Sequence, residues 1–201
     1  MNLHKKREEE ALLWLQFKKG DKDAFAILYK THILSLIAYG SKLCTDKEAL
    51  KDAIHELFVE LWNSRSNLAD TDSVTFYLIK ALRYKLIRLE KQRHIQTRVP
   101  AANFNKSHFE DPIEASIIER ETLDSNIAHL RKAIQALTTR QQEVIQLRFY
   151  QGFSNEQIAE IMSMHYQSVS NLLYNALCRL KETIKNPDFI AAIPLISLFF
   201  I

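Results

Sequence analysis

Residues 154–173 read SNEQIAEIMSMHYQSVSNLL, and this stretch predicts two short helices joined by a tight turn. Ser154 suits an N-cap, and Gln157, three residues later, completes a capping box that starts the first helix. Ile158 and Ile161 give that helix its apolar side.

The spacing across the turn is typical of a DNA-reading helix-turn-helix. Ala159 is small enough for a crossing helix to approach, Ser163 lies in the turn, and Val169 follows ten residues after the alanine. Glycine usually occupies the turn position, because φ > 0 is needed there. An ordinary helical hairpin is the alternative. The second helix carries uncharged hydrogen-bonding side chains that reach base edges: Tyr166, Gln167, Ser168, Ser170 and Asn171.

The composition indicates an all-α protein. Glycine and proline are scarce, with three and four residues in a chain of 201, which predicts helices with short connections. Cys44 and Cys178 lie far apart without partners at metal-ligand spacing, so we expect no disulfide framework, no metal and a reducing cytoplasm. Residues 1–10 are charged and lack the apolar run of a signal peptide.

Charge is unevenly distributed, although the net charge is only +3. Between residues 80 and 98 there are seven Lys or Arg against the single acid Glu90, whereas between residues 110 and 124 there are six acids against Arg120. The first segment attracts phosphates and the second repels them. The alternative for each is a solvated helix face.

Breaks in periodicity divide the chain into two small helical domains. We expect a first domain at 5–98, a flexible acidic linker at 99–112, a helix-turn-helix domain at 113–185 and a tail at 186–201. The end of the tail has no charge, is too short to span a bilayer, and is interrupted by Pro194. It either folds back onto the second domain or contacts a partner protein or membrane surface.

Polar residues predict where helices of the first domain begin and end. Gly20 is a candidate C-cap, and Asp21 or Asp23 can cap the next helix. The spacing Thr45-x-x-Glu48 predicts a capping box at the start of the third helix.

Three segments together resemble the small extracytoplasmic-function class of bacterial RNA polymerase sigma factors, in the sigma-70 family. Residues 46–62 (DKEALKDAIHELFVELW) are similar to the helix of its region 2, and residues 76–83 (FYLIKALR) to the start of its promoter-melting helix. Residues 137–145 (LTTRQQEVI), with the downstream helix-turn-helix, are similar to region 4. The order and separation of these segments carry the resemblance more than any single motif does.

The resemblance implies that the first domain binds core polymerase and the −10 element. The contact with the polymerase clamp helices would come from Asp52, His55, Glu56 and Trp62, although Trp62 fits core packing equally well. Aromatic faces and cations can hold a melted strand, because stacking tolerates any base and phosphates need neutralising. Arg83 and Tyr84 lead the set that supplies this chemistry: Phe76, Lys80, Arg83, Tyr84, Lys85, Arg88, Lys91 and Arg93.

The resemblance also implies that the second domain reads the −35 element as duplex. Gln and Asn suit adenine in the major groove. The candidate base-reading residues are Tyr166, Gln167, Ser168, Ser170 and Asn171, and the candidate phosphate contacts are Arg140, Ser154 and Gln157.

The chain departs from the family at several positions. Thr138 replaces a common proline, Tyr84 and Arg88 stand where relatives commonly have Asn and Asp, and Ser170 stands where Lys or Arg is frequent. The resemblance therefore implies the class of the protein but does not specify the promoter sequence.

Two other functions remain as alternatives. One is a free-standing helix-turn-helix regulator that binds duplex DNA as a dimer. The other is an enzyme acting on nucleic acid, but the seven histidines are scattered and show no metal or catalytic spacing. The expected partners are RNA polymerase core, promoter DNA and, as the resemblance implies, an anti-sigma factor that can be membrane-bound. No cofactor and no small-molecule substrate are expected.

Overall fold

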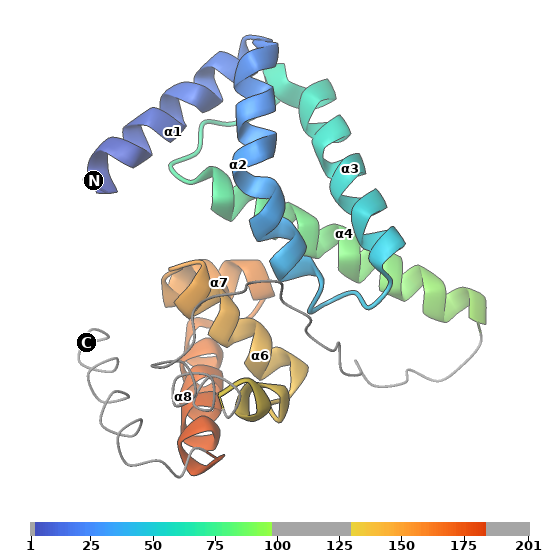
Figure 1. Cartoon of the computed structure of the whole chain (residues 1–201), viewed down its shortest axis with the longest axis vertical. Helices are drawn as coiled ribbons and strands as arrows, with labels where there is room; N and C mark the ends of the chain where they lie inside the picture. The colour runs from blue at the N-terminus through green and yellow to red at the C-terminus, as the bar shows by residue number, and fades with distance from the viewer. Residues whose placement is uncertain (1–2, 98–129, 184–201) are drawn as a thin grey trace, which may run out of the picture. The chain divides into compact units, whose positions relative to one another are not determined.

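The computed structural model describes residues 3–97 and 130–183, and its described residues form helices and turns without strands. The all-α prediction is therefore confirmed (Figure 1). The chain forms two compact units, Met1–Ser107 and His108–Ile201. The linker 99–112, the tail 186–201 and the boundaries predicted at 98, 112 and 185 lie outside the described residues, and they stay predictions.

In residues 3–97, the described part of the first unit, the chain forms four long helices. These are α1 (Leu3–Lys18), α2 (Lys22–Gly40), α3 (Lys47–Ser64) and α4 (Val74–Thr97), with a short 3₁₀ turn, η1 (Arg65–Asn67), after α3. Helix α2 packs against α1, α3 and α4, and α3 also packs against α4 (Figure 1).

The end of α2 comes very close to its neighbours. A Cβ at Gly40 would collide with the side chain of Leu50 on α3 and touch Leu82 on α4. A larger residue at this position would require the Leu50 side chain to move. At the other end of α2, Asp21 provides the cap, and Gly20 before it adopts a φ of +92° after α1, as the sequence predicts.

The start of α3 differs from the prediction. Asp46, not Thr45, is the N-cap, and its carboxylate accepts the N–H groups of Glu48 and Ala49 at 3.1 Å each. The same carboxylate lies 2.6 Å from Nη2 of Arg93 on α4. The predicted capping box was wrong because an aspartate one residue later makes the same cap and also gains an ion pair.

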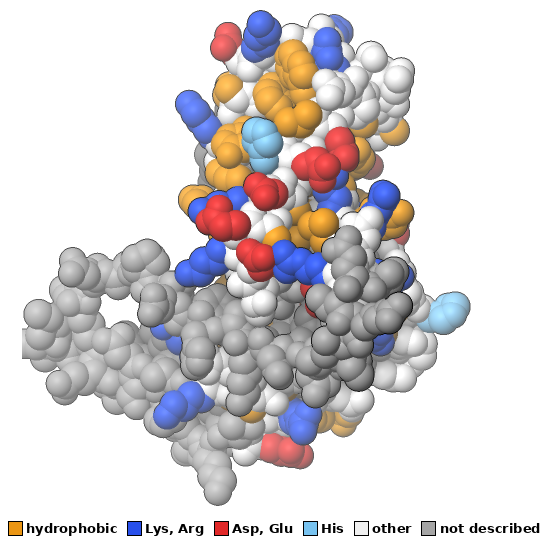
Figure 2. Space-filling model, turned by 90° about the vertical axis from the view of Figure 1, so that its right-hand side faces the viewer, with side chains coloured by type: hydrophobic (Ala, Val, Ile, Leu, Met, Phe, Trp, Pro, Cys, Tyr) orange, Lys and Arg blue, Asp and Glu red, His pale blue; other side chains and the backbone are white. Residues whose placement is uncertain are grey.

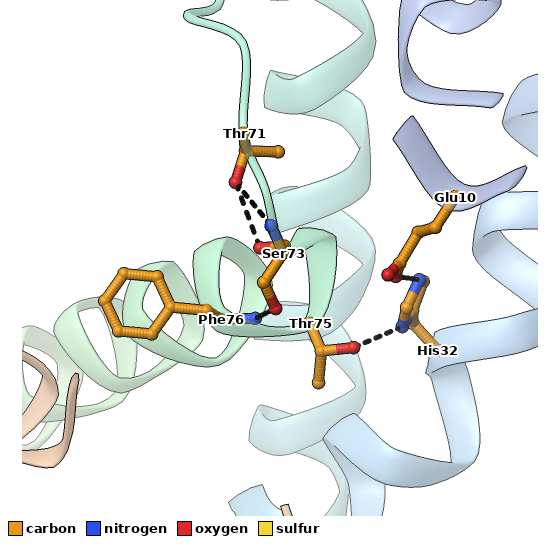
Figure 3. A network of polar contacts seen from close by, with 6 residues as sticks. All are labelled: Glu10, His32, Thr71, Ser73, Thr75 and Phe76. Carbon is orange, nitrogen blue, oxygen red and sulfur yellow. Dashed lines mark hydrogen bonds and ion pairs between the residues drawn. The ribbon is translucent and has the colours of Figure 1, made fainter. Parts of the chain in front are cut away.

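Helix α4 begins at a small hydrogen-bonded turn (Figure 3). Ser73 Oγ accepts the N–H of Phe76 at 3.2 Å, and Thr71 Oγ1 accepts the N–H of Ser73 at 3.2 Å. The Phe76 ring points away from these contacts in Figure 3. The turn therefore fixes the start of α4, the helix that carries the predicted −10 contacts from Phe76 onward.

A buried histidine lies beside this turn. Nδ1 of His32 on α2 is 3.4 Å from Thr75 Oγ1 on α4, and Nε2 is 3.3 Å from Glu10 Oε1 on α1 (Figure 3). Glu10 Oε1 is within ion-pair distance of Nε2, but the contact does not have the geometry of a hydrogen bond. These contacts bring three helices together at one polar point inside the unit.

The second unit is built around the helix-turn-helix. Residues 130–135 are helical, followed by α6 (Thr139–Ile145), a π-helical turn, η2 (Gln146–Tyr150), α7 (Asn155–Met162) and α8 (Tyr166–Thr183). Both α6 and α7 pack against α8.

The predicted start of α7 and the predicted turn are both confirmed. Ser154 Oγ accepts the N–H of Gln157, and Gln157 Oε1 accepts the N–H of Ser154 at 3.0 Å, as in a capping box. Ser163 has φ 53° and ψ 50°, the left-handed conformation, and among the described residues it is the one non-glycine with positive φ. Val169 is fully buried behind the turn.

We predict that Asp46→Ala lowers the urea midpoint of unfolding, because α3 loses its cap and Arg93 loses its carboxylate. The N–H of Ala49 and then the guanidinium of Arg93 hold the pKa of Asp46 below its usual 3.8. The stabilisation is thus present above about pH 4 and is lost as the pH falls through the lowered pKa. Thr45→Ala is the matched control, and a larger loss for Thr45→Ala would contradict the cap assignment.

Ser163→Gly should stabilise the protein by up to about 1 kcal/mol, because glycine adopts the left-handed conformation without steric cost. Urea unfolding followed by circular dichroism measures the change. The same replacement inside α8, Ser168→Gly, should instead destabilise by about 0.5 kcal/mol. Equal effects at the two positions would show that the turn stores no strain.

Candidate nucleic-acid interface

The outer side of α4 carries a row of cationic and aromatic side chains. Lys80, Tyr84, Arg88 and Lys91 are all exposed, and their spacing places them on one face of the helix. Tyr84 is 70% exposed. An ammonium or guanidinium beside an open aromatic ring can neutralise phosphates and stack on bases at the same time. The predicted Phe76 and Arg83 are half-buried.

Two of the predicted cations lie on the side of α4 that faces α3. Nζ of Lys85 is 3.0 Å from Glu56 Oε2 and 2.7 Å from Glu60 Oε1, and the Lys85 side chain is 14% exposed. Arg93 pairs with Asp46 at the other end of α3. These ion pairs join α4 to α3 at two points.

The ion pairs raise the pKa values of both cations. Burial by itself lowers the pKa of Lys85, but the hydrogen bonds and charges of Glu60 and Glu56 outweigh it and raise the pKa above 10.5. Asp46 likewise raises the pKa of Arg93. Both side chains therefore carry a full positive charge at neutral pH.

The outer face of α3 mixes acidic, imidazole and apolar groups. Asp52, His55 and Glu56 are exposed, as the core-polymerase prediction requires. Val59, 44% exposed, lies one turn after His55. Figure 2, seen from the α3 side, shows hydrophobic side chains beside a histidine and several carboxylates on this unit. Such a surface fits a protein partner better than it fits DNA, because its carboxylates repel phosphates.

Trp62 is half-buried at the end of this face. Its ring centroid is 5.1 Å from that of Phe25 and 6.3 Å from that of Phe17, and the Arg65 guanidinium lies 4.5 Å above the ring. The residue therefore packs against the core while part of it stays accessible. A partner contact by Trp62 stays a prediction.

Sequence reasoning missed two residues of this surface. Tyr29 on α2 is 39% exposed, and its ring packs edge-on at 4.8 Å against Phe58 of α3. Val59 follows Phe58 in the sequence of α3 and lies outside the stripe of buried apolar residues on that helix. The signal for Val59 was an apolar residue on the polar side of an amphipathic helix.

The second helix of the helix-turn-helix presents most of its predicted reading residues to solvent. Tyr166, Gln167, Ser168 and Asn171 are exposed on α8. Tyr174, 69% exposed, comes one turn after Asn171 and was not predicted. Its spacing from Asn171 was the available signal, since residues three apart share a helix face.

Ser170 is the exception among the predicted reading residues. It is half-buried, and its Oγ accepts a hydrogen bond from Asn155 Nδ2 at 3.3 Å. This bond joins the first turn of α7 to α8. Ser170 therefore contributes to the packing of the two helices, and base reading by Ser170 stays a prediction.

The three predicted phosphate contacts have different surroundings. Arg140 is exposed on α6. Ser154 and Gln157 use Ser154 Oγ and Gln157 Oε1 in the capping box, and the exposed Glu156 lies between them. The hydrogen bond from Ser154 lowers the pKa of Glu156, which keeps a negative charge beside this helix start. Arg140 is thus the strongest phosphate candidate of the three.

Arg148 supports the turn before α7. Its Nη1 donates to the carbonyl of Phe153 at 2.8 Å, and burial lowers the pKa of its guanidinium. The side chain therefore links η2 to the residue that precedes the Ser154 cap.

Within residues 3–97 and 130–183, no group of three or more His, Cys, Asp or Glu side chains is placed to hold a metal ion. None of the helices in that part of the chain is both long and apolar enough to cross a membrane.

A family model matches the second unit of this chain, and a curated relative matches most of the chain. Residues 128–180 match the family model for sigma-70, region 4. The ECF RNA polymerase sigma factor SigX of Bacillus subtilis (strain 168) is 23% identical over 164 residues, which span 80% of this chain and 84% of SigX.

Two solved structures have a similar fold. CnrH, solved in complex with the cytosolic domain of CnrY, is 17% identical with a TM-score of 0.57, and the match covers 86% of this chain and 95% of CnrH. RpoE from Bartonella quintana, solved with the anti-sigma factor NepR, is 20% identical with a TM-score of 0.63, and the match covers 83% of this chain and 99% of RpoE. At these identities the likeness supports the fold alone.

Proposed function

Because the chain belongs to the extracytoplasmic-function class of the sigma-70 family, we propose that it directs promoter-specific transcription initiation in the cytoplasm as a subunit of RNA polymerase. The first domain (5–98) binds core polymerase and the −10 element. The linker (99–112) connects it to the second domain (113–185), which binds the −35 element.

The exposed row on α4 supports the −10 assignment. A melted strand offers unstacked bases and a phosphate chain, and the row offers an open tyrosine ring flanked by cations. The exposed residues of α8 support the −35 assignment, since amide and hydroxyl side chains at the start of a recognition helix read the major groove.

Core polymerase binds the outer face of α3 in this proposal. Asp52, His55 and Glu56 supply polar contacts, and Val59 with Trp62 supplies apolar area. Polar rims around a small apolar centre are typical of protein interfaces. An anti-sigma factor, membrane-bound or not, would inhibit the protein by covering this face. The complexes of RpoE with NepR and of CnrH with CnrY motivate that partner.

One observation carries the proposal against a free-standing regulator. The chain combines the helix-turn-helix of the second unit with a first unit whose α4 exposes strand-binding chemistry. A duplex-binding regulator has no use for an aromatic and cationic row suited to single strands. A sigma factor needs both surfaces in one chain.

Run-off transcription with bacterial core polymerase on a pool of genomic fragments tests the proposal. Initiation at discrete starts only when the protein is present would support it, and would give the −10 and −35 sequences together. Duplex binding without core polymerase, and no new starts with it, would favour the free-standing regulator instead.

Tyr84→Ala should reduce open-complex formation at such a start by about 5- to 150-fold, because stacking of one base contributes about 1–3 kcal/mol. Tyr84→Phe keeps the ring and should retain most of the activity. Permanganate reactivity of thymines in the melted region measures the effect. Equal losses for the two variants would show that the ring does not stack on a base.

Asn171→Ala should weaken initiation at promoters with an intact −35 element by about 5- to 150-fold, the range for losing a bidentate base contact. Asn175→Ala, an exposed asparagine one turn further along α8, is the matched control. Transcription from promoters with single substitutions in the −35 element would show whether Asn171→Ala relaxes specificity at one position. A uniform loss at every −35 sequence would assign Asn171 to phosphate binding.

A further inference from the structure

Lys85 lies where the two surfaces of the first unit meet. It belongs to α4, the proposed strand-binding helix, but its ammonium is bound between two carboxylates of α3, the proposed polymerase-binding helix. The Lys85 side chain is 14% exposed, whereas those of Glu56 and Glu60 are 64% and 59% exposed. The cation is thus covered, and its two acceptors remain open to a partner.

The ion-pair cluster of Lys85, Glu56 and Glu60 contains two carboxylates but one ammonium. Glu56 and Glu60 surround one ammonium, so the cluster keeps a net negative charge on the outer face of α3. Asp52, exposed one turn earlier on the same face, adds to it. A cationic side chain of a protein partner would be attracted to this cluster.

While both carboxylates hold Lys85, its ammonium is not available to a DNA phosphate. The carboxylates of Glu56 and Glu60 are more than half exposed, and exposed ionic groups form individually weak pairs, so a partner cation can take over one or both. The long, flexible lysine side chain could then turn toward solvent, where the neighbouring Tyr84 and Arg88 of α4 are exposed.

We propose that Glu56 and Glu60 act as a latch on Lys85: they keep it from nucleic acid in the free chain and release it as a phosphate contact when a cationic surface of core polymerase occupies them. Lys85 would then link polymerase binding to strand binding. This inference rests on the proposed function, because it takes core polymerase as the partner of α3.

The number of phosphate contacts provides the readout. Each contact to a single strand changes the slope of log K against log salt concentration by about 0.7. The probe is a fluorescein-labelled dT20 oligonucleotide, bound by the full chain alone or with core polymerase. The variants are Lys85→Met, the pair Glu56→Gln with Glu60→Gln, and the three substitutions combined.

In the chain without core polymerase and without other substitutions, we expect Lys85→Met to leave the slope of log K against log salt concentration unchanged. In the Glu56→Gln, Glu60→Gln background, and in the complex with core polymerase, the same change should reduce the slope by about 0.7. Lys91→Met is the matched control: Lys91 is exposed on the same helix, so its removal should reduce the slope equally in every state. Circular dichroism of each variant checks that the helices remain folded.

A Lys85→Met effect of the same size in the free chain, the Gln variants and the polymerase complex would overturn the latch. So would no effect in any of them, which would assign Lys85 to α3–α4 packing alone. If run-off transcription succeeds, neither result would contradict the proposed function. Failure of transcription and of polymerase binding would instead overturn the proposed function and this inference with it.

Discussion

The burial of one side of α4 is the constraint on which the first unit depends. Leu78, Leu82 and Leu86 are almost completely buried against the neighbouring helices, and each buried leucine contributes roughly 1.5–3 kcal/mol. This burial fixes the rotation of α4 about its axis. It therefore decides that Tyr84 faces solvent and that Lys85 faces α3. The ion pairs to α3 refine this arrangement but contribute less than the apolar contacts do.

The helix-turn-helix depends on a comparable local constraint. Ser163 adopts the left-handed conformation, and Val169 fills the space behind the turn. Together with the bond between Asn155 and Ser170, they hold α7 against α8. The reading residues then lie on a rigid helix, so little conformational entropy is lost when they meet a base.

Local features could be predicted from the sequence, whereas contacts between distant segments could not. The Ser154 capping box was predictable, because both partners lie within one helical turn. The Thr45 box was wrong because the ion pair of Asp46 with Arg93, 47 residues away, is invisible in local spacing. Equally, a row of cations on α4 does not reveal that Lys85 is bound by α3. The fold class followed from composition and periodicity, but the packed structure was needed to show which residues of α4 are exposed and which face α3.

The central claim is that this chain contacts promoter DNA through α4 and α8 at once, as part of polymerase. Photo-crosslinking of the holoenzyme to a promoter tests it most directly, with 5-iodouracil placed either in the melted strand or in the upstream duplex. We predict cross-links from the melted strand to Tyr84 and from the upstream duplex to Tyr166, each identified by mass spectrometry. Cross-links to α8 alone, with none to α4 from any position, would contradict the account.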